Sequence, residues 1–226
     1  MLRQTLPVLA LLLTTTAAFA QAPAAGSAAA NRTLPADVHP VSLTRLPPLT
    51  RDDLDDAGKA VYDGIVRGGP APTTGPVALS LYSPPIAKVF DELNSFLRYN
   101  GVLSPRHTEV AIIVAAWEIE QQYEYSAHEG AALQYGAPQA VIDTIKYNRE
   151  PEGLSPEETL IIKLGRAIMR DHKVDSALYA EAERLFGRRG IVELVTVMGD
   201  YVMVGMIMTA IDQQMPADRP ALLPPR

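Results

Sequence analysis

Apolar residues along most of this chain recur every three to four positions, the spacing of one face of an α-helix. No segment shows the sustained alternation of apolar and polar residues that is typical of a β-strand. Proline, glycine and capping residues divide the pattern into separate segments. The pattern predicts helices over residues 54–65, 77–82, 86–99, 105–117, 139–147, 156–171, 176–187 and 191–211, with a further helix through the stretch 123–129. We therefore expect an all-α fold, a compact helical bundle.

Several of these helices have recognisable N-terminal signals. Ser104-Pro105 supplies a capping serine followed by a proline at the first helical position. Ser155-Pro156-Glu157-Glu158 adds the glutamate of a capping box, and Asp175 caps the next helix. In the helix over 86–99, the spacing predicts a buried stripe formed by Val89, Leu93, Phe96 and Leu97.

The segment Ile191–Ile211 is apolar on nearly every side, which raises the question of a membrane span. It contains Glu193 and Asp200, and a charged residue near the centre of a span costs about 2.5–3.5 kcal/mol on insertion scales. Burial between neighbouring helices or subunits is therefore the better interpretation. One small subunit cannot cover so many apolar faces, so we expect a homo-oligomer.

The N-terminal residues 1–20 have the features of a secretory signal peptide. Arg3 provides a positive charge, Leu6–Leu13 an apolar core, and Ala18-Phe19-Ala20 a cleavage site with cleavage after Ala20. We expect a secreted or periplasmic protein with no membrane attachment after cleavage. The remaining composition predicts a flexible Pro/Ala-rich leader over 21–45, a helical domain over 46–215 and a Pro-rich tail over 216–226.

Composition excludes several classes of function. The net charge is -6 and no cluster of Lys and Arg is present, so a nucleic-acid-binding surface is not expected. Cysteine is absent from the whole chain. The protein therefore has no disulfide, no thiolate nucleophile, no dithiol redox centre and no cysteine-ligated metal.

Candidate chemistry gathers in the stretch Tyr123–Glu129. On a helix, Glu124 and His128 lie one turn apart on the same face. A carboxylate beside an imidazole forms a proton-handling pair, because each group shifts the pKa of the other. A Glu/His pair on a solvated helix face is the alternative interpretation. Glu109, near the start of the preceding apolar helix, is a candidate third member; its alternative role is to interact with the helix dipole.

The segments Leu103–Glu109 and Tyr123–His128, taken together, resemble the carboxymuconolactone decarboxylase family, which shares its fold with alkylhydroperoxidase-like proteins. The supporting segments are Gly68–Pro70, Leu81–Pro84 and Arg98-Tyr99. The resemblance covers roughly residues 46–210. It depends on the order and spacing of these segments together, because each segment alone is a weak signal. It implies an all-helical subunit that assembles into trimers or hexamers, with its site near the subunit contacts.

The family's redox branch has a glutamate, a C-x-x-C pair and a histidine. By the resemblance, the glutamate corresponds to Glu109 and the histidine to His128. The two cysteine positions correspond to Gln121 and Glu124. Neither Gln121 nor Glu124 can form a disulfide or a sulfenate, so thiol-based peroxide reduction is excluded. The decarboxylase-like branch has a Tyr-Glu-aromatic segment before the histidine, as in Tyr123-Glu124-Tyr125.

The resemblance implies a decarboxylation of a small carboxylated lactone that needs no cofactor and no metal. His128 is then the candidate general acid/base, since an imidazole titrates near neutral pH. Glu124 would orient or polarise it. Glu109 would be a second acid/base or would hold His128 from the facing side.

Three further residues are candidates for binding the small-molecule substrate. Arg106 is a candidate receptor for a substrate carboxylate, although an arginine in a first helical turn is also common at a surface. Tyr123 and Tyr125 are candidates to line the pocket, the alternative being core aromatics.

Other functions are also compatible with these residues. His128, Glu124 and Glu109 form a conceivable zinc ligand set, but nothing in their spacing requires a metal and the resemblance speaks against one. A lactone or ester hydrolase would use His128 and Glu124 to activate water. A non-catalytic oligomeric binding protein would retain the fold without the chemistry.

Overall fold

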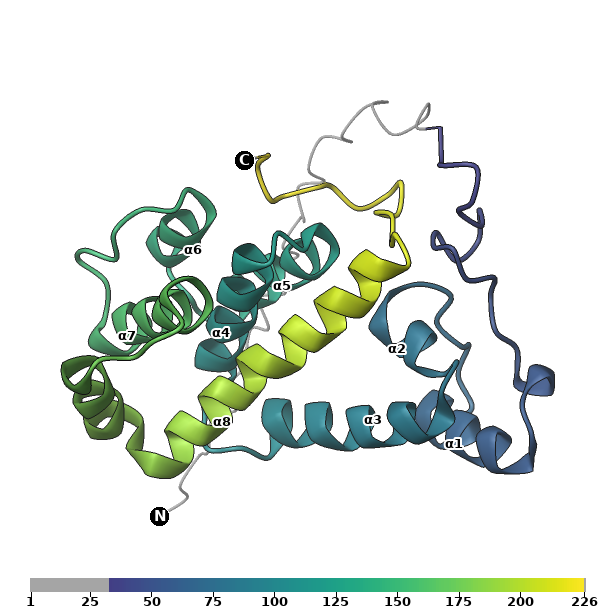
Figure 1. Cartoon of the computed structure of the whole chain (residues 1–226), viewed down its shortest axis with the longest axis horizontal. Helices are drawn as coiled ribbons and strands as arrows, with labels where there is room; N and C mark the ends of the chain where they lie inside the picture. The colour runs from purple at the N-terminus through teal and green to yellow at the C-terminus, as the bar shows by residue number, and fades with distance from the viewer. Residues whose placement is uncertain (1–32, 226) are drawn as a thin grey trace, which may run out of the picture. The chain divides into compact units, whose positions relative to one another are not determined.

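The computed structural model describes residues 33–225, and every regular element within them is helical (Figure 1). The elements in chain order are η1 (Arg51–Asp53), α1 (Asp56–Val66), α2 (Gly75–Ser80), α3 (Pro84–Tyr99), α4 (Pro105–Glu118), α5 (Gln122–Gln134), α6 (Gln139–Lys146), α7 (Pro156–Arg166), η2 (Ala167–Asp171) and α8 (Ser176–Ala210). The all-α prediction is confirmed. The expected signal peptide lies outside the described residues.

Helix α4 is the centre of the fold. It begins at Ser104, whose hydroxyl accepts a hydrogen bond from the backbone N–H of His107 at 3.2 Å. All residues from Thr108 to Trp117 are buried, because α5, α7 and α8 all pack against this helix. A helix that is apolar on every side has no solvent-facing surface, so it occupies the middle of the bundle. Glu109 is thereby carried into the protein interior.

A tight turn joins α4 to α5. Glu120 adopts a left-handed conformation with φ of 56°, and the Gln121 side chain accepts the backbone N–H of Tyr123 at 3.0 Å as the cap of α5. This turn returns the chain against α4, and the two helices share the most extensive contact in the fold. The residues of α5 that face α4 therefore lie opposite Glu109.

Helix α8 begins at the predicted cap Asp175, whose carboxylate accepts the backbone N–H of Leu178 at 2.8 Å. At Gly187 the backbone has φ of 66° and ψ of 171°, which breaks the helix where the sequence predicts its end. The second half crosses α4, as the diagonal yellow-green helix in Figure 1 shows. α8 is long and apolar enough to cross a membrane by length and composition, but half of its most apolar window is buried inside the protein.

The predicted buried stripe of α3 is wrong at two positions. Val89 is 62% exposed and Phe96 is 40% exposed, whereas Ala87, Phe90 and Leu97 are buried. Apolar residues lie on two faces of α3, and only one of these faces packs against the rest of the chain. Spacing alone does not distinguish the two faces.

Both ends of the described chain pack onto the bundle. Within the predicted leader, Thr44 is fully buried and the backbone N–H of Arg45 donates to the carbonyl of Ile211 at 2.9 Å. At the other end, the backbone N–H of Leu222 donates to the hydroxyl of Ser126 on α5 at 3.0 Å. The packed structure thus extends beyond both boundaries of the expected domain, 46–215.

Candidate active site

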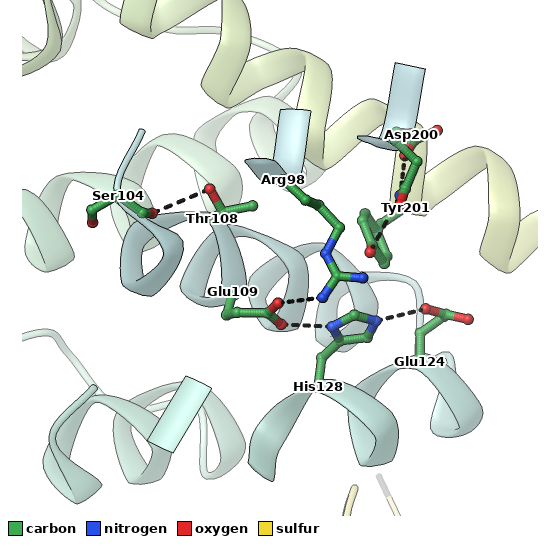
Figure 2. A network of polar contacts seen from close by, with 9 residues as sticks. Arg98, Ser104, Thr108, Glu109, Glu124, His128, Asp200 and Tyr201 are labelled. Atoms are coloured by element: carbon green, nitrogen blue, oxygen red, sulfur yellow. Dashed lines mark hydrogen bonds and ion pairs between the residues drawn. The ribbon is translucent and has the colours of Figure 1, made fainter. Parts of the chain in front are cut away.

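The structure brings Glu109, Glu124 and His128 into direct contact (Figure 2). Nδ1 of His128 lies 2.6 Å from Oε2 of Glu109, and its Nε2 lies 3.4 Å from Oε2 of Glu124. Each carboxylate side chain is only 2% exposed and the imidazole is 11% exposed. The imidazole thus lies between two buried carboxylates, one from α4 and one from its own helix.

Arg98 on α3 is a fourth member of this cluster. Its Nη2 donates to Oε1 of Glu109 at 2.8 Å, so Glu109 accepts from the guanidinium with one oxygen and contacts the imidazole with the other. The Arg98 side chain is 24% exposed. Through Glu109, the cluster connects three consecutive helices, α3, α4 and α5.

Burial and charge act in opposite directions on these groups. Burial by itself would raise the pKa of Glu109, but the hydrogen bond to His128 and the charge of Arg98 outweigh it and lower that pKa. Burial would lower the pKa of His128, but the hydrogen bonds to Glu109 and Glu124 outweigh it and raise that pKa. Both shifts favour an ionised Glu109 beside a protonated His128.

The two sides of the imidazole are held unequally. The contact to Glu109 is short, as expected for a charge-assisted hydrogen bond, while the contact to Glu124 is long. Oε1 of Glu124 is buried and has no hydrogen-bond partner among residues 33–225. The proton on Nε2 of His128 is the loosely held one, and the Glu124 side is where a substrate could accept it.

Helix α8 covers the cluster with Asp200 and Tyr201. The rings of Tyr201 and His128 form a T-shaped pair with a centroid distance of 4.9 Å and an interplanar angle of 85°. Asn94 on α3 donates from Nδ2 to Oδ2 of Asp200 at 3.1 Å and to the Tyr201 hydroxyl at 3.4 Å. Burial raises the pKa of Asp200, and the charge of Glu124 raises it further. Burial also raises the pKa of Tyr201.

Sequence reasoning did not assign roles to four of these residues, Arg98, Asn94, Asp200 and Tyr201. Asp200 had the clearest signal, since an acidic residue within an otherwise apolar helix is rarely buried without a specific role or partner. Arg98 belongs to the Arg98-Tyr99 segment that supported the family resemblance. Asn94 and Tyr201 had no comparable signal.

The three predicted substrate-binding residues lie elsewhere. Nε of Arg106 is 3.5 Å from a carboxylate oxygen of buried Glu158. Tyr123 packs in a separate apolar cluster, with its hydroxyl 3.3 Å from that of Thr74. Tyr125 is fully buried in the main core. The structure shows no contact between these three side chains and the imidazole of His128.

The zinc alternative gains no support from the geometry. Within residues 33–225, no group of three or more His, Cys, Asp or Glu side chains is arranged to hold a metal ion. Glu109 is the only carboxylate that approaches Nδ1 of His128 in this part of the chain. One of its oxygens already accepts a hydrogen bond from Arg98, so that oxygen is not available to a metal ion.

Comparison with solved structures shows the fold. A cysteine-to-alanine variant of the debrominase Bmp8, in complex with 2,3,4-tribromopyrrole, superposes with a TM-score of 0.60 and 14% identity over 76% of this chain and 91% of that one. A peroxidase-related protein with the alkylhydroperoxidase AhpD core from Ralstonia eutropha JMP134 gives a TM-score of 0.62 and 16% identity, over 79% and 94% of the two chains. A peroxidase-related protein from Silicibacter sp. TM1040 gives 0.58 and 15%, over 76% and 93%.

These neighbours confirm the expected fold, which is that of the carboxymuconolactone decarboxylase and AhpD-like proteins. No protein-family profile matches the chain, and no curated protein matches it in sequence. At sequence identities of 14–16%, the similarity to these structures shows the fold but not the activity. The function must therefore be argued from the site itself.

Proposed function

We propose that this protein catalyses the decarboxylation of a small carboxylated lactone by acid/base chemistry without a cofactor, with His128 as the proton donor. The observation that carries the proposal is the difference between the two carboxylate contacts of the His128 imidazole. Glu109 holds Nδ1 at 2.6 Å, while the contact of Nε2 with Glu124 is 3.4 Å. A histidine held this way is oriented and protonated on one side and able to transfer a proton on the other.

The proposed reaction has two parts. The bond between the substrate carbon and its carboxylate breaks, CO2 leaves, and the electron pair stays on the organic fragment. The proton on Nε2 of His128 then passes to the carbon that lost CO2, leaving a neutral imidazole. His128 is 11% exposed, and it regains its proton from solvent through this exposed part.

Glu109 and Arg98 are positioning residues in this scheme. The carboxylate of Glu109 keeps the imidazole protonated and fixes its ring, and Arg98 holds that carboxylate from the other side. The arrangement corresponds to the way many enzymes orient a catalytic histidine through a hydrogen-bonded carboxylate. Glu124 fixes the direction in which the Nε2 proton points.

The absence of cysteine separates this protein from thiol peroxidase chemistry. One structural neighbour is described as a debrominase and two as peroxidase-related, and those descriptions belong to those proteins. By the sequence resemblance, Glu124 corresponds to a cysteine of the redox branch, and a carboxylate cannot form a disulfide. Proton transfer is the chemistry that the cluster of Glu109, Glu124 and His128 supports.

We also propose that the protein acts as a homo-oligomer, a trimer or a hexamer. The large apolar side chains that are at least 40% exposed on α3 and α8 are Ile86, Val89, Phe96, Tyr99, Tyr179, Val192, Met203, Met206 and Ile207. Exposed apolar patches of this kind mark protein interaction sites. Since α3 and α8 also carry Arg98 and Tyr201, assembly through these helices would place a subunit contact near the site.

A substrate screen tests the proposed activity. The purified mature protein is incubated with a set of small lactones and carboxylated lactones, and CO2 release and ring opening are monitored together. We expect CO2 release from a carboxylated lactone and its loss in His128→Ala, with unchanged helical circular dichroism. His107→Ala, on the neighbouring helix α4, is the matched control and should retain activity. Ring opening without CO2 release would instead identify a hydrolase, and binding without turnover a binding protein.

A further inference from the structure

Asp200 is a buried acid with no part in the proposed proton transfer from His128. It is 4% exposed, and its helix neighbours Val197 and Val204 are both buried. Oδ2 accepts the amide of Asn94 at 3.1 Å, whereas Oδ1 has no hydrogen-bond partner among residues 33–225. A buried polar atom without a partner is rare and costly in proteins, and it calls for a physical explanation.

The charges around Asp200 indicate its protonation state. Arg98 and protonated His128 carry two positive charges, and Glu109 and Glu124 carry two negative charges. The cluster is therefore neutral without any contribution from Asp200. An ionised Asp200 would add an unbalanced negative charge close to Glu124 in a buried site. Burial and the charge of Glu124 accordingly raise the pKa of Asp200.

A neutral Asp200 has its hydrogen on Oδ1. Because Oδ2 accepts from Asn94, the unpartnered Oδ1 is the oxygen that carries the proton, and its O–H has no acceptor in the described part of the chain. A carboxylic acid kept neutral by an apolar site can act as a strong hydrogen-bond donor at neutral pH.

Tyr201 offers a second donor beside it. Its hydroxyl oxygen faces the amide of Asn94 at 3.4 Å, which leaves its own hydrogen available, and its ring packs against His128. Figure 2 shows Asp200 and Tyr201 on the same stretch of α8, with Tyr201 above the imidazole and Asp200 above Glu124. Both groups therefore lie next to the cluster of His128 and Glu124, Tyr201 through its ring contact with the imidazole and Asp200 within the influence of the Glu124 charge.

We propose that Asp200, as a neutral carboxylic acid, and the Tyr201 hydroxyl donate hydrogen bonds to the oxyanion that forms on the substrate. This inference rests on the proposed decarboxylation. When CO2 leaves, the electron pair of the broken bond is delocalised onto a carbonyl oxygen of the substrate, which becomes the oxyanion of an enolate. The pair then returns to carbon, which takes the proton from Nε2 of His128, and the carbonyl is restored.

The inference narrows the class of substrate. The carboxylate that leaves must be attached to a carbon from which the electron pair can reach a carbonyl oxygen, either directly or through a conjugated double bond. A lactone with its carboxyl group in such a position satisfies this requirement. An isomer with the carboxyl group on an isolated saturated carbon generates no oxyanion and should not react.

Infrared spectroscopy tests the protonation state of Asp200 without any turnover. We expect the difference spectrum between wild type and Asp200→Asn at neutral pH to contain the C=O band of a protonated carboxylic acid. The band should shift when the protein is made with carboxyl-13C aspartate. A difference spectrum with only carboxylate bands would overturn the inference. Because no substrate is involved, this result is independent of the proposed function.

Kinetics with a carboxylated lactone test the role as a donor. Asp200→Val removes the donor, and kcat should fall about 10²–10³-fold, the usual effect of losing one oxyanion donor. Asp200→Asn retains a neutral N–H donor and should keep more activity than Asp200→Val. Tyr201→Phe removes only a hydroxyl and should also lower kcat. Equal loss in Asp200→Asn and Asp200→Val, or no loss in Asp200→Val, would contradict the proposal. No turnover by the wild type would refute the decarboxylation itself.

Discussion

Replacement of Glu109 by glutamine is the perturbation that most sharply tests the buried cluster. Glutamine keeps the size of the side chain but removes the negative charge. Its carbonyl oxygen can accept from only one of the two present partners, His128 or Arg98, and its amide then faces the other. We expect a folded but less stable protein in which His128 loses its proton more readily.

The size of the effect follows from the two contacts of Glu109, at 2.6 Å to His128 and at 2.8 Å to Arg98. A hydrogen bond to a charged group contributes about 1.5–3 kcal/mol to stability. Removal of one partner of a buried ion pair costs about 3–5 kcal/mol. Because Arg98 is 24% exposed and can be partly solvated, we expect a loss of about 3 kcal/mol in the free energy of unfolding.

The loss should depend on pH in a defined direction. The pKa of His128 is raised by folding, so its contribution is complete below the unfolded pKa of about 6.5 and is lost as the pH rises through the folded pKa. The pKa of Glu109 is lowered, so its contribution is present above about pH 4.3 and is lost as the pH falls through the folded pKa. The difference between wild type and variant should be largest between these limits.

Urea unfolding followed by circular dichroism measures this difference at about pH 5.5 and about pH 9, on either side of the ordinary histidine pKa. We expect a smaller difference at the higher pH, because the charge of His128 contributes less as the pH rises above its unfolded pKa. Glu181→Gln, which breaks an exposed ion pair with Arg184, is the control and should leave the unfolding midpoint unchanged at both pH values. An equal difference at both pH values would refute the ion pair between Glu109 and His128.

Three further predictions concern other parts of the chain. The pKa of Asp200 is raised, so its contribution to the stability of the wild type should fall as the pH rises above the unfolded pKa of about 3.9, and Asp200→Asn should lack this contribution. Melting temperatures of the two proteins that differ by the same amount at acid and neutral pH would contradict it. Arg106→Ala should leave KM unchanged, because its guanidinium contacts Glu158, and an increase in KM would restore Arg106 as a substrate-binding residue. Light scattering at micromolar concentration should show an oligomer that Met206→Glu weakens, since Met206 is 65% exposed on α8; a wild-type monomer would refute the assembly.

Local signals in the sequence were sufficient to predict most of the helices. Ser104, Ser155 and Asp175 each cap a helix through the side chain, as expected from their positions. Capping and proline effects act within one helical turn, so they are readable without knowledge of the tertiary structure. The face of α3 that packs inward was not readable in this way. Apolar residues on two faces, such as Phe90 and Phe96, differ in burial only because of what other helices cover.

The candidate site shows the same division between local and distant information. Glu124 and His128 are one turn apart on a single helix, so their proximity follows from helical geometry. The contact of Glu109 with His128 depends on the tight turn that joins α4 and α5, and the family resemblance pointed to it. Asn94 and Asp200 meet across more than a hundred residues, and no local pattern pairs them.

The most direct test of the account is the fate of the proton that His128 is proposed to deliver. The reaction of a carboxylated lactone is run in D2O, and the product is analysed by NMR and mass spectrometry for deuterium at the carbon that lost CO2. The account predicts CO2 release with one deuteron added to a single face of that carbon by the wild type, and no turnover by His128→Ala. Deuterium on both faces, or a ring-opened product that has kept its carboxyl group, would contradict proton delivery by His128.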